Sequence, residues 1–234
     1  MEKQEVLLKD YSDIEKGAYL GAIGSIATAD HIASEEETEY MMALADSAGL
    51  SDEQKALVLR AATEMSGDEL KICLDILKGS DLKYSLVTDL VSFAESDKQY
   101  SPGEKANVEK IAQYLDINKE QFSMLDDFVK TTSKKQTTPE QLSKPAFLSS
   151  LGLEEKFKNS GINISKLTKG LLGVVGPMII AGLVTRGLRG RTGGLGGVNP
   201  FGNRRGGLGS LISTLNRGRG FSSTGGLLGR MFGI

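Results

Sequence analysis

Apolar residues recur at intervals of three and four through the first 130 residues of the chain, the spacing that places side chains on one face of an α-helix. No stretch alternates between apolar and polar residues as a β-strand does. The segments are marked by Ile14, Ala18, Ile23, Ile26 and Ala27; Tyr40, Met41, Leu44, Ala45 and Ala48; Leu57, Val58 and Ala61; Leu70, Cys73, Leu74 and Leu77; Leu82, Leu86, Leu90 and Phe93; Val108, Ile111, Ala112 and Leu115; and Phe122, Leu125 and Val129. The pattern predicts an all-α helical bundle of about seven helices.

Capping boxes mark where most of these helices begin. In such a box Ser, Thr or Asn precedes the helix and Glu or Gln follows three residues later, so that two side chains accept bonds from backbone N–H groups that the first turn leaves unpaired. The boxes are Ser12/Glu15, Ser34/Glu37, Ser51/Gln54, Ser66/Glu69, Ser101/Glu104 and Asn118/Gln121. Pro102 directly follows Ser101, at the first helical position, where proline is favoured.

The chain also repeats itself at an offset of 67 residues. From about Ile14 to Gln54 the alignment needs no gap. Matched pairs include Ile23 with Leu90, Ile26 with Phe93, Asp30 with Asp97, Ser34 with Ser101, Glu37 with Glu104, Leu44 with Ile111 and Leu50 with Ile117. The repeat predicts a bundle of two pseudo-symmetric halves, each burying the apolar face of the other.

The net charge of −2 conceals two regions of opposite charge. Residues 1–155 contain all 30 acidic residues and 16 basic ones, whereas residues 156–234 contain 12 basic residues and no acidic one. Of the 29 glycines, 21 lie beyond residue 160. We therefore predict a helical domain at residues 1–130, a polar linker with a short helix at residues 131–165, and a basic, Gly-rich, apolar tail at residues 166–234.

The repeated turn has the form Ala27-x-x-Asp30-x-x-x-Ser34-x-x-Glu37, and again Ala94-x-x-Asp97-x-x-x-Ser101-x-x-Glu104. It resembles the signature of the tellurite-resistance TerB-like family over roughly residues 12–129. The resemblance implies a stress-associated, membrane-linked helical protein. It also implies a divalent cation (calcium, magnesium or manganese) at Asp30, Glu37, Asp97 and Glu104. The chain departs from the family pattern where the family has Gly, since His31 and Lys98 stand there.

These acidic residues have a second interpretation, which is purely structural. The Ser/Glu pairs are explained as capping boxes, and the aspartates can accept hydrogen bonds within the turn. A calcium or magnesium site needs several convergent oxygen ligands. The sequence leaves both interpretations open.

Enzymatic chemistry has no support in the sequence. The single cysteine, Cys73, lies in an apolar helical pattern and is expected to be a buried thiol, and the single histidine, His31, has no partner arrangement. There is no Gly-rich phosphate loop in the domain and no G-x-S-x-G elbow. We predict neither catalysis nor a small-molecule substrate. The charged N-terminus lacks a signal peptide, so a cytoplasmic location is expected.

The tail begins with an apolar segment flanked by basic residues. The uninterrupted run from Gly170 to Val184 is shorter than the ~20 residues of a membrane-spanning helix. Such a segment suits an anionic membrane surface, where the protein would be peripheral; a buried or self-associating segment is the alternative. The residues predicted to bind membrane or a partner are Leu171, Leu172, Val174, Val175, Met178, Ile179, Ile180, Arg186, Arg189 and Arg191.

Beyond residue 187 the tail mixes Gly and Arg with short apolar motifs. Leu208, Leu211, Ile212 and Leu215 have the spacing of a short amphipathic helix, which suits lipid, a protein partner or the acidic domain itself. The Leu-rich interruptions disfavour a nucleic-acid tract. The sequence therefore predicts a non-catalytic adaptor attached to membrane by its tail. The alternative is a soluble assembly protein whose Gly/Arg tail binds a protein partner or nucleic acid.

Overall fold

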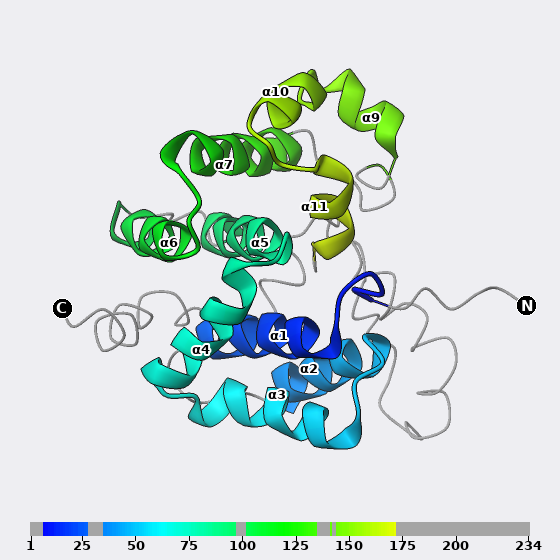
Figure 1. Ribbon diagram of the computed structural model, residues 1–234, viewed down its shortest axis with the longest axis vertical. Helices are drawn as coiled ribbons and strands as arrows, with labels where there is room; N and C mark the ends of the chain where they lie inside the picture. Colours follow the sequence, from blue (N-terminus) through cyan, green and yellow to red (C-terminus); the bar gives the residue numbers. More distant parts are fainter. Residues whose placement is uncertain (1–6, 28–34, 97–101, 135–140, 142–143, 172–234) are drawn as a thin grey trace, which may run out of the picture.

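The computed structural model describes residues 7–27, 35–96, 102–134, 141 and 144–171 (Figure 1). These residues form helices and connecting turns with no strand among them, which confirms the all-α prediction. The seven helices expected from the periodicity are all present, and shorter helices follow them.

The first half of the bundle is arranged around helix α1. It comprises α1 (Asp13–Ala27), α2 (Glu35–Ser47), α3 (Asp52–Glu64) and α4 (Gly67–Lys78). Helix α1 packs against both α3 and α4, and its buried face carries Tyr19, Ile23 and Ile26. The second half comprises α5 (Leu82–Ser96), α6 (Pro102–Tyr114) and α7 (Lys119–Lys134), with α5 packed against the other two.

The predicted repeat is present in the backbone. Helices α2 and α6 begin 67 residues apart, and so do α3 and α7. The turns between them match in detail, because Gly49 and Asp116 both take a left-handed conformation, with φ of 71° and 55°. In each turn the next residue's N–H closes the helix end: Leu50 donates to the Ala45 carbonyl at 3.2 Å and Ile117 to the Ala112 carbonyl at 2.9 Å. Glycine adopts this conformation freely, whereas aspartate adopts it at a steric cost.

The capping boxes that lie within the described residues form as predicted. The backbone N–H of Ser51 donates to the side chain of Gln54 at 3.0 Å, and the Gln54 N–H donates back to Ser51 Oγ at 3.3 Å. The equivalent box at Asn118 and Gln121 has distances of 3.1 and 2.9 Å. Boxes are also formed at Ser12/Glu15 and Ser66/Glu69. Those at Ser34 and Ser101 lie outside the described residues.

The folded body continues beyond the boundary near residue 130 that the sequence suggested. Helix α7 runs to Lys134, and α9 (Pro145–Ser150), α10 (Glu154–Asn159) and α11 (Ile164–Gly170) follow. Phe157 of α10 is fully buried, and its ring meets that of Phe128 on α7 edge to face, with centroids 5.6 Å apart. Leu167 of α11 is buried as well. Part of the region expected to be a linker is therefore core.

Candidate functional site

The four residues predicted to bind a cation lie largely outside the part of the chain that the structure describes. Asp30 and Asp97 are not among the described residues. Glu37 and Glu104 lie at the beginning of α2 and α6, in equivalent positions of the two halves, but their side chains are not described. Within the described ranges, no group of three or more His, Cys, Asp or Glu side chains is arranged to bind a metal ion.

The predicted attachment segment begins where the described chain ends. Leu171 is only 2% exposed, because it packs into the core at the end of α11, and it therefore belongs to the folded body. The other nine predicted residues lie outside the described residues: Leu172, Val174, Val175, Met178, Ile179, Ile180, Arg186, Arg189 and Arg191. In the part of the chain that can be described, no helix is both long and apolar enough to cross a membrane.

Helix α11 is bound to the body through its backbone carbonyls. Ser85 Oγ on α5 donates to the carbonyl of Leu167 at 3.1 Å, and the Tyr19 hydroxyl lies 2.9 Å from the carbonyl oxygen of Gly170. The contact is close: a Cβ on Gly170 would lie 2.2 Å from Ser85 Oγ. On the surface, Lys166 Nζ forms an ion pair with Asp81 at 2.6 Å. The tail therefore leaves the body from a fixed point.

Tyr19 and Asp89 form a buried polar contact at the centre of the molecule. The Tyr19 hydroxyl donates to the Asp89 carboxylate, and both residues are buried. Burial, and secondarily the Asp89 charge, raise the pKa of Tyr19 well above its usual value. The same two causes raise the pKa of Tyr40. Because the pair is enclosed by helices, it joins α1 to α5 and offers no surface to a ligand.

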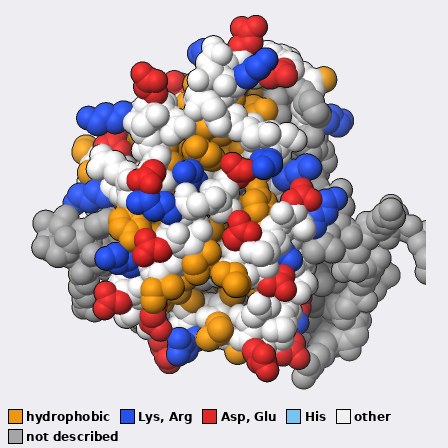
Figure 2. All heavy atoms as spheres, in the orientation of Figure 1, with side chains coloured by type: hydrophobic (Ala, Val, Ile, Leu, Met, Phe, Trp, Pro, Cys, Tyr) orange, Lys and Arg blue, Asp and Glu red, His pale blue; other side chains and the backbone are white. Residues whose placement is uncertain are grey.

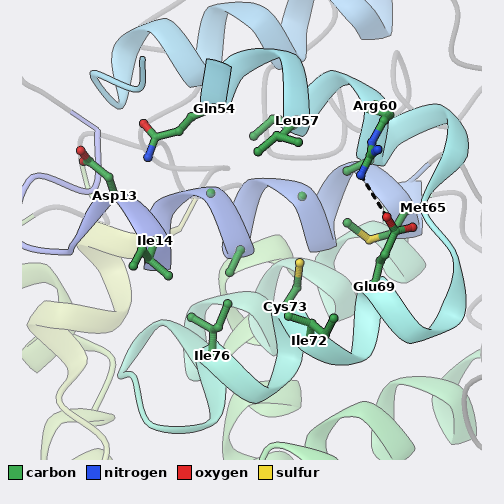
Figure 3. A pocket seen from close by; sticks show the side chains of 15 residues that line it. Asp13, Ile14, Gln54, Leu57, Arg60, Met65, Glu69, Ile72, Cys73 and Ile76 are labelled. Atoms are coloured by element: carbon green, nitrogen blue, oxygen red, sulfur yellow. Dashed lines mark hydrogen bonds and ion pairs between the residues drawn. The ribbon is translucent and has the colours of Figure 1, made fainter. Parts of the chain in front are cut away.

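An open apolar groove runs along α1 in the described body, between α3 and α4 (Figure 3). We call it the α1–α3–α4 groove; its volume is about 380 Å³. Leu57 of α3 and Ile72 and Ile76 of α4 point toward it from opposite sides. Hydrophobic side chains gather on this part of the surface, with charged groups around them (Figure 2). The groove is lined by Asp13, Ile14, Gly17, Ala18, Gly21, Gln54, Leu57, Val58, Arg60, Ala61, Met65, Glu69, Ile72, Cys73 and Ile76.

Small residues of α1 form the floor of this groove. A Cβ on Gly17 would meet no heavy atom within 4 Å, so the space above this residue is open. A Cβ on Gly21 would touch Met65 and Ala61 at ordinary contact distances of 3.4 and 3.6 Å. The polar groups lie at the two ends, where Asp13 stands near one and an Arg60–Glu69 ion pair of 3.0 Å stands at the other.

The sequence did not predict the groove, because two of its rim residues were assigned to the apolar faces of their helices. Ile14 and Leu57 fit the helical apolar stripes, yet they are 67% and 58% exposed, and Ile72 is 60% exposed. Cys73, expected to be buried, is half-buried on the groove wall. Burial raises the pKa of its thiol to about 11, so little thiolate is present near neutral pH. The glycines on the apolar face of α1 were the one feature of the sequence that indicated a groove with a floor of small residues.

The described residues thus define an all-helical domain of two related halves, with a buried polar contact inside and an apolar groove on the surface. Residues 17–127 match the family described as tellurite resistance protein TerB. This part of the chain is therefore a TerB-family domain, as the repeated turns had suggested. Neither the curated proteins nor the solved structures gave a match.

Proposed function

We propose that the protein is a non-catalytic adaptor whose TerB-family domain is attached to anionic membrane by its tail. The observation that carries this proposal is the position of α11. This helix is bound to α5 and α1 through Leu167 and Gly170, and the apolar run with its basic flank follows directly. The acidic body is thereby joined to a segment of opposite charge at a defined point of its surface.

The described chemistry supports a binding role. The TerB family is generally regarded as non-catalytic. The polar pair inside the bundle is enclosed, and the Cys73 thiol, the sole cysteine, has a raised pKa that makes it a poor nucleophile. Apolar residues flanked by arginines are suited to the headgroup region of a bilayer, where the arginines meet lipid phosphates and the apolar side chains enter the acyl boundary.

Vesicle flotation of the full chain tests the membrane attachment. We expect the chain to float with vesicles that contain phosphatidylserine, at low and high salt. Ile179→Asp with Ile180→Asp should abolish flotation at both. Replacing Arg186, Arg189 and Arg191 with Gln should weaken partitioning about 100-fold at low salt, since each basic residue near such a surface contributes about 1 kcal/mol. Arg217→Gln with Arg219→Gln is the matched control, distant from the apolar run, and should have the smaller effect.

Two results would contradict membrane attachment. If the full chain stays with the soluble fraction at both salt concentrations, membrane attachment is excluded. The tail would then act on a protein partner or another copy of the chain. A chain that floats equally well with the isoleucine pair replaced would also contradict the proposal, because insertion of the apolar run is its physical basis.

We also propose that the two repeated turns bind a divalent cation through Asp30, Glu37, Asp97 and Glu104. What favours this is their equivalence: each turn joins the first helix of its half to the second, α1 to α2 and α5 to α6. Carboxylates in such turns supply the oxygen ligands that calcium, magnesium and manganese require.

Calorimetric titration of the full chain with each of these cations is the test. We expect a saturable heat that is lost in the Asp30→Asn, Asp97→Asn double variant. Asp52→Asn is the control, since that carboxylate begins α3, is fully exposed and lies outside the turns. Absence of heat from all three cations, or an unchanged heat in the double variant, would refute cation binding at the turns.

A further inference from the structure

The α1–α3–α4 groove exposes apolar side chains that a soluble domain ordinarily covers. Ile14, Leu57 and Ile72 are all more than half exposed and lie along one depression. The Gly17 floor leaves room between the α3 and α4 walls. A depression of this form, open along its length and apolar throughout its middle, is the kind of surface that receives the apolar face of an amphipathic helix.

The chain itself contains a segment of the matching pattern. Leu208, Leu211, Ile212 and Leu215 stand at i, i+3, i+4 and i+7, so a helix over these residues would place all four side chains on one face. Two arginines precede the segment and two follow it within four residues, and no acidic residue lies near.

The charges of the two surfaces are complementary. Helices α1–α4 together carry 13 acidic and 5 basic residues. Asp13 and Glu69 line the groove, Asp13 in an ion pair with Lys16 and Glu69 in one with Arg60. The arginines that flank the tail segment would meet these carboxylates while the four apolar residues enter the groove.

The tether is long enough for the segment to reach the groove of its own chain. Tail residues leave the body at Leu171, next to Tyr19 of α1, and the groove lies along the same helix. Thirty-six residues separate Leu171 from Leu208. A Gly-rich chain of this length has a root-mean-square span of about 30–36 Å. The body has a radius of gyration of about 15 Å, and a flexible tether of this kind gives an effective concentration in the millimolar range.

We propose that residues 208–215 bind as a short amphipathic helix in the α1–α3–α4 groove of the same chain. The tail is then attached to the body at two places, at α11 and at the groove, with the segment between them forming a closed loop. The inference goes beyond membrane attachment and does not depend on it, because the loop residues 172–207 are the ones offered to lipid.

Disulfide trapping on the full chain tests the proposal, because Cys73 lines the groove and is the sole cysteine in the sequence. In an Ile212→Cys variant, oxidised at high dilution and alkaline pH, we expect a disulfide within the monomer between Cys73 and the introduced cysteine, identified by mass spectrometry of the linked peptides. It should form at least about tenfold faster than the link in a Ser222→Cys variant, whose cysteine is on the same tail outside the segment.

A variant in which the groove is filled by a larger side chain provides a second test. Gly17→Phe places a ring in the open space above the floor and should reduce the Ile212→Cys linking rate to that of the Ser222→Cys control. Gly79→Phe is the matched control, since a Cβ there also meets nothing within 4 Å and the residue caps α4 outside the groove lining. Circular dichroism should show both variants folded.

Three results would overturn the proposal. Equal linking rates at positions 212 and 222 would mean that the tail visits the groove without a specific contact. Links found only between two chains would assign the groove to the tail of a second copy. Linking at position 212 that persists unchanged in Gly17→Phe would show that the segment lies elsewhere.

Discussion

Phe157→Ala is expected to lower the free energy of unfolding by about 4 kcal/mol. Phe157 is fully buried, and its ring packs edge to face against Phe128 of α7 at 5.6 Å. Alanine would remove the ring, leave a cavity between α7 and α10, and lose the aromatic contact. Urea denaturation followed by circular dichroism measures the change in midpoint and slope.

The comparison with Phe147→Ala makes this result specific. Phe147 lies on α9 and is only partly buried, so its removal should cost clearly less. If Phe157→Ala costs under about 1 kcal/mol, α10 is not part of the cooperatively folded body, and a domain ending near residue 130 would be the correct boundary. A loss near 4 kcal/mol places α10 within the cooperatively folded body.

Gly170→Ala is expected to destabilise the protein by about 2–3 kcal/mol, although alanine usually favours a helix. The added Cβ would lie 2.2 Å from Ser85 Oγ, 2.9 Å from Ser85 Cβ and 3.1 Å from Leu82 Cδ2. The hydroxyl can rotate, but the Cβ of Ser85 is fixed by the α5 backbone, so α11 must shift. The bonds to the Leu167 and Gly170 carbonyls would then lengthen.

A double-mutant cycle with Ser85→Gly identifies the cause. Ser85→Gly alone should cost about 2 kcal/mol, through the lost hydrogen bond to Leu167 and a glycine within α5. Adding Gly170→Ala to it should cost little more, giving a coupling of about 2 kcal/mol. Gly79→Ala, where a Cβ has open space, should change stability by less than about 0.5 kcal/mol. Additive losses at positions 85 and 170 would refute the steric explanation.

The sequence predicted the helical body well because its signals are local. The capping box at Ser51 and Gln54 marks the beginning of α3 without knowledge of any other element, and Asn118 and Gln121 do the same for α7. The repeat supplied the larger architecture, since Gly49 and Asp116 end their helices with the same backbone geometry. Neither conclusion depended on which residues meet across the bundle.

The region after α7 was harder to predict because it lacks such local signals. Helices α10 and α11 have six and seven residues, too few to show a clear helical period, and turns with positive φ at Gly152 and Gly161 interrupt the pattern. Their stability comes from contacts distant in sequence, such as Phe157 with Phe128. A polar composition between residues 131 and 165 therefore suggested a linker where the chain packs on the body.

The groove was missed because periodicity identifies an apolar face and not what covers it. Ile14 and Ala18 lie one turn apart on α1, yet Ala18 is buried and Ile14 is 67% exposed. The difference depends on where the ends of α3 and α4 lie relative to α1, which no single helix encodes. The tail segment that we place there was, by contrast, visible in the sequence from its spacing alone.

The Tyr19 hydroxyl has one hydrogen and two acceptors, the Asp89 carboxylate and the Gly170 carbonyl. A phenol can donate that hydrogen to one acceptor at a time, and a carboxylate is the stronger of the two. When α11 separates from the body, Tyr19 keeps its bond to Asp89, whereas Ser85 Oγ loses its acceptor, the Leu167 carbonyl. We expect detachment of α11 to be a local opening with a smaller free energy than global unfolding.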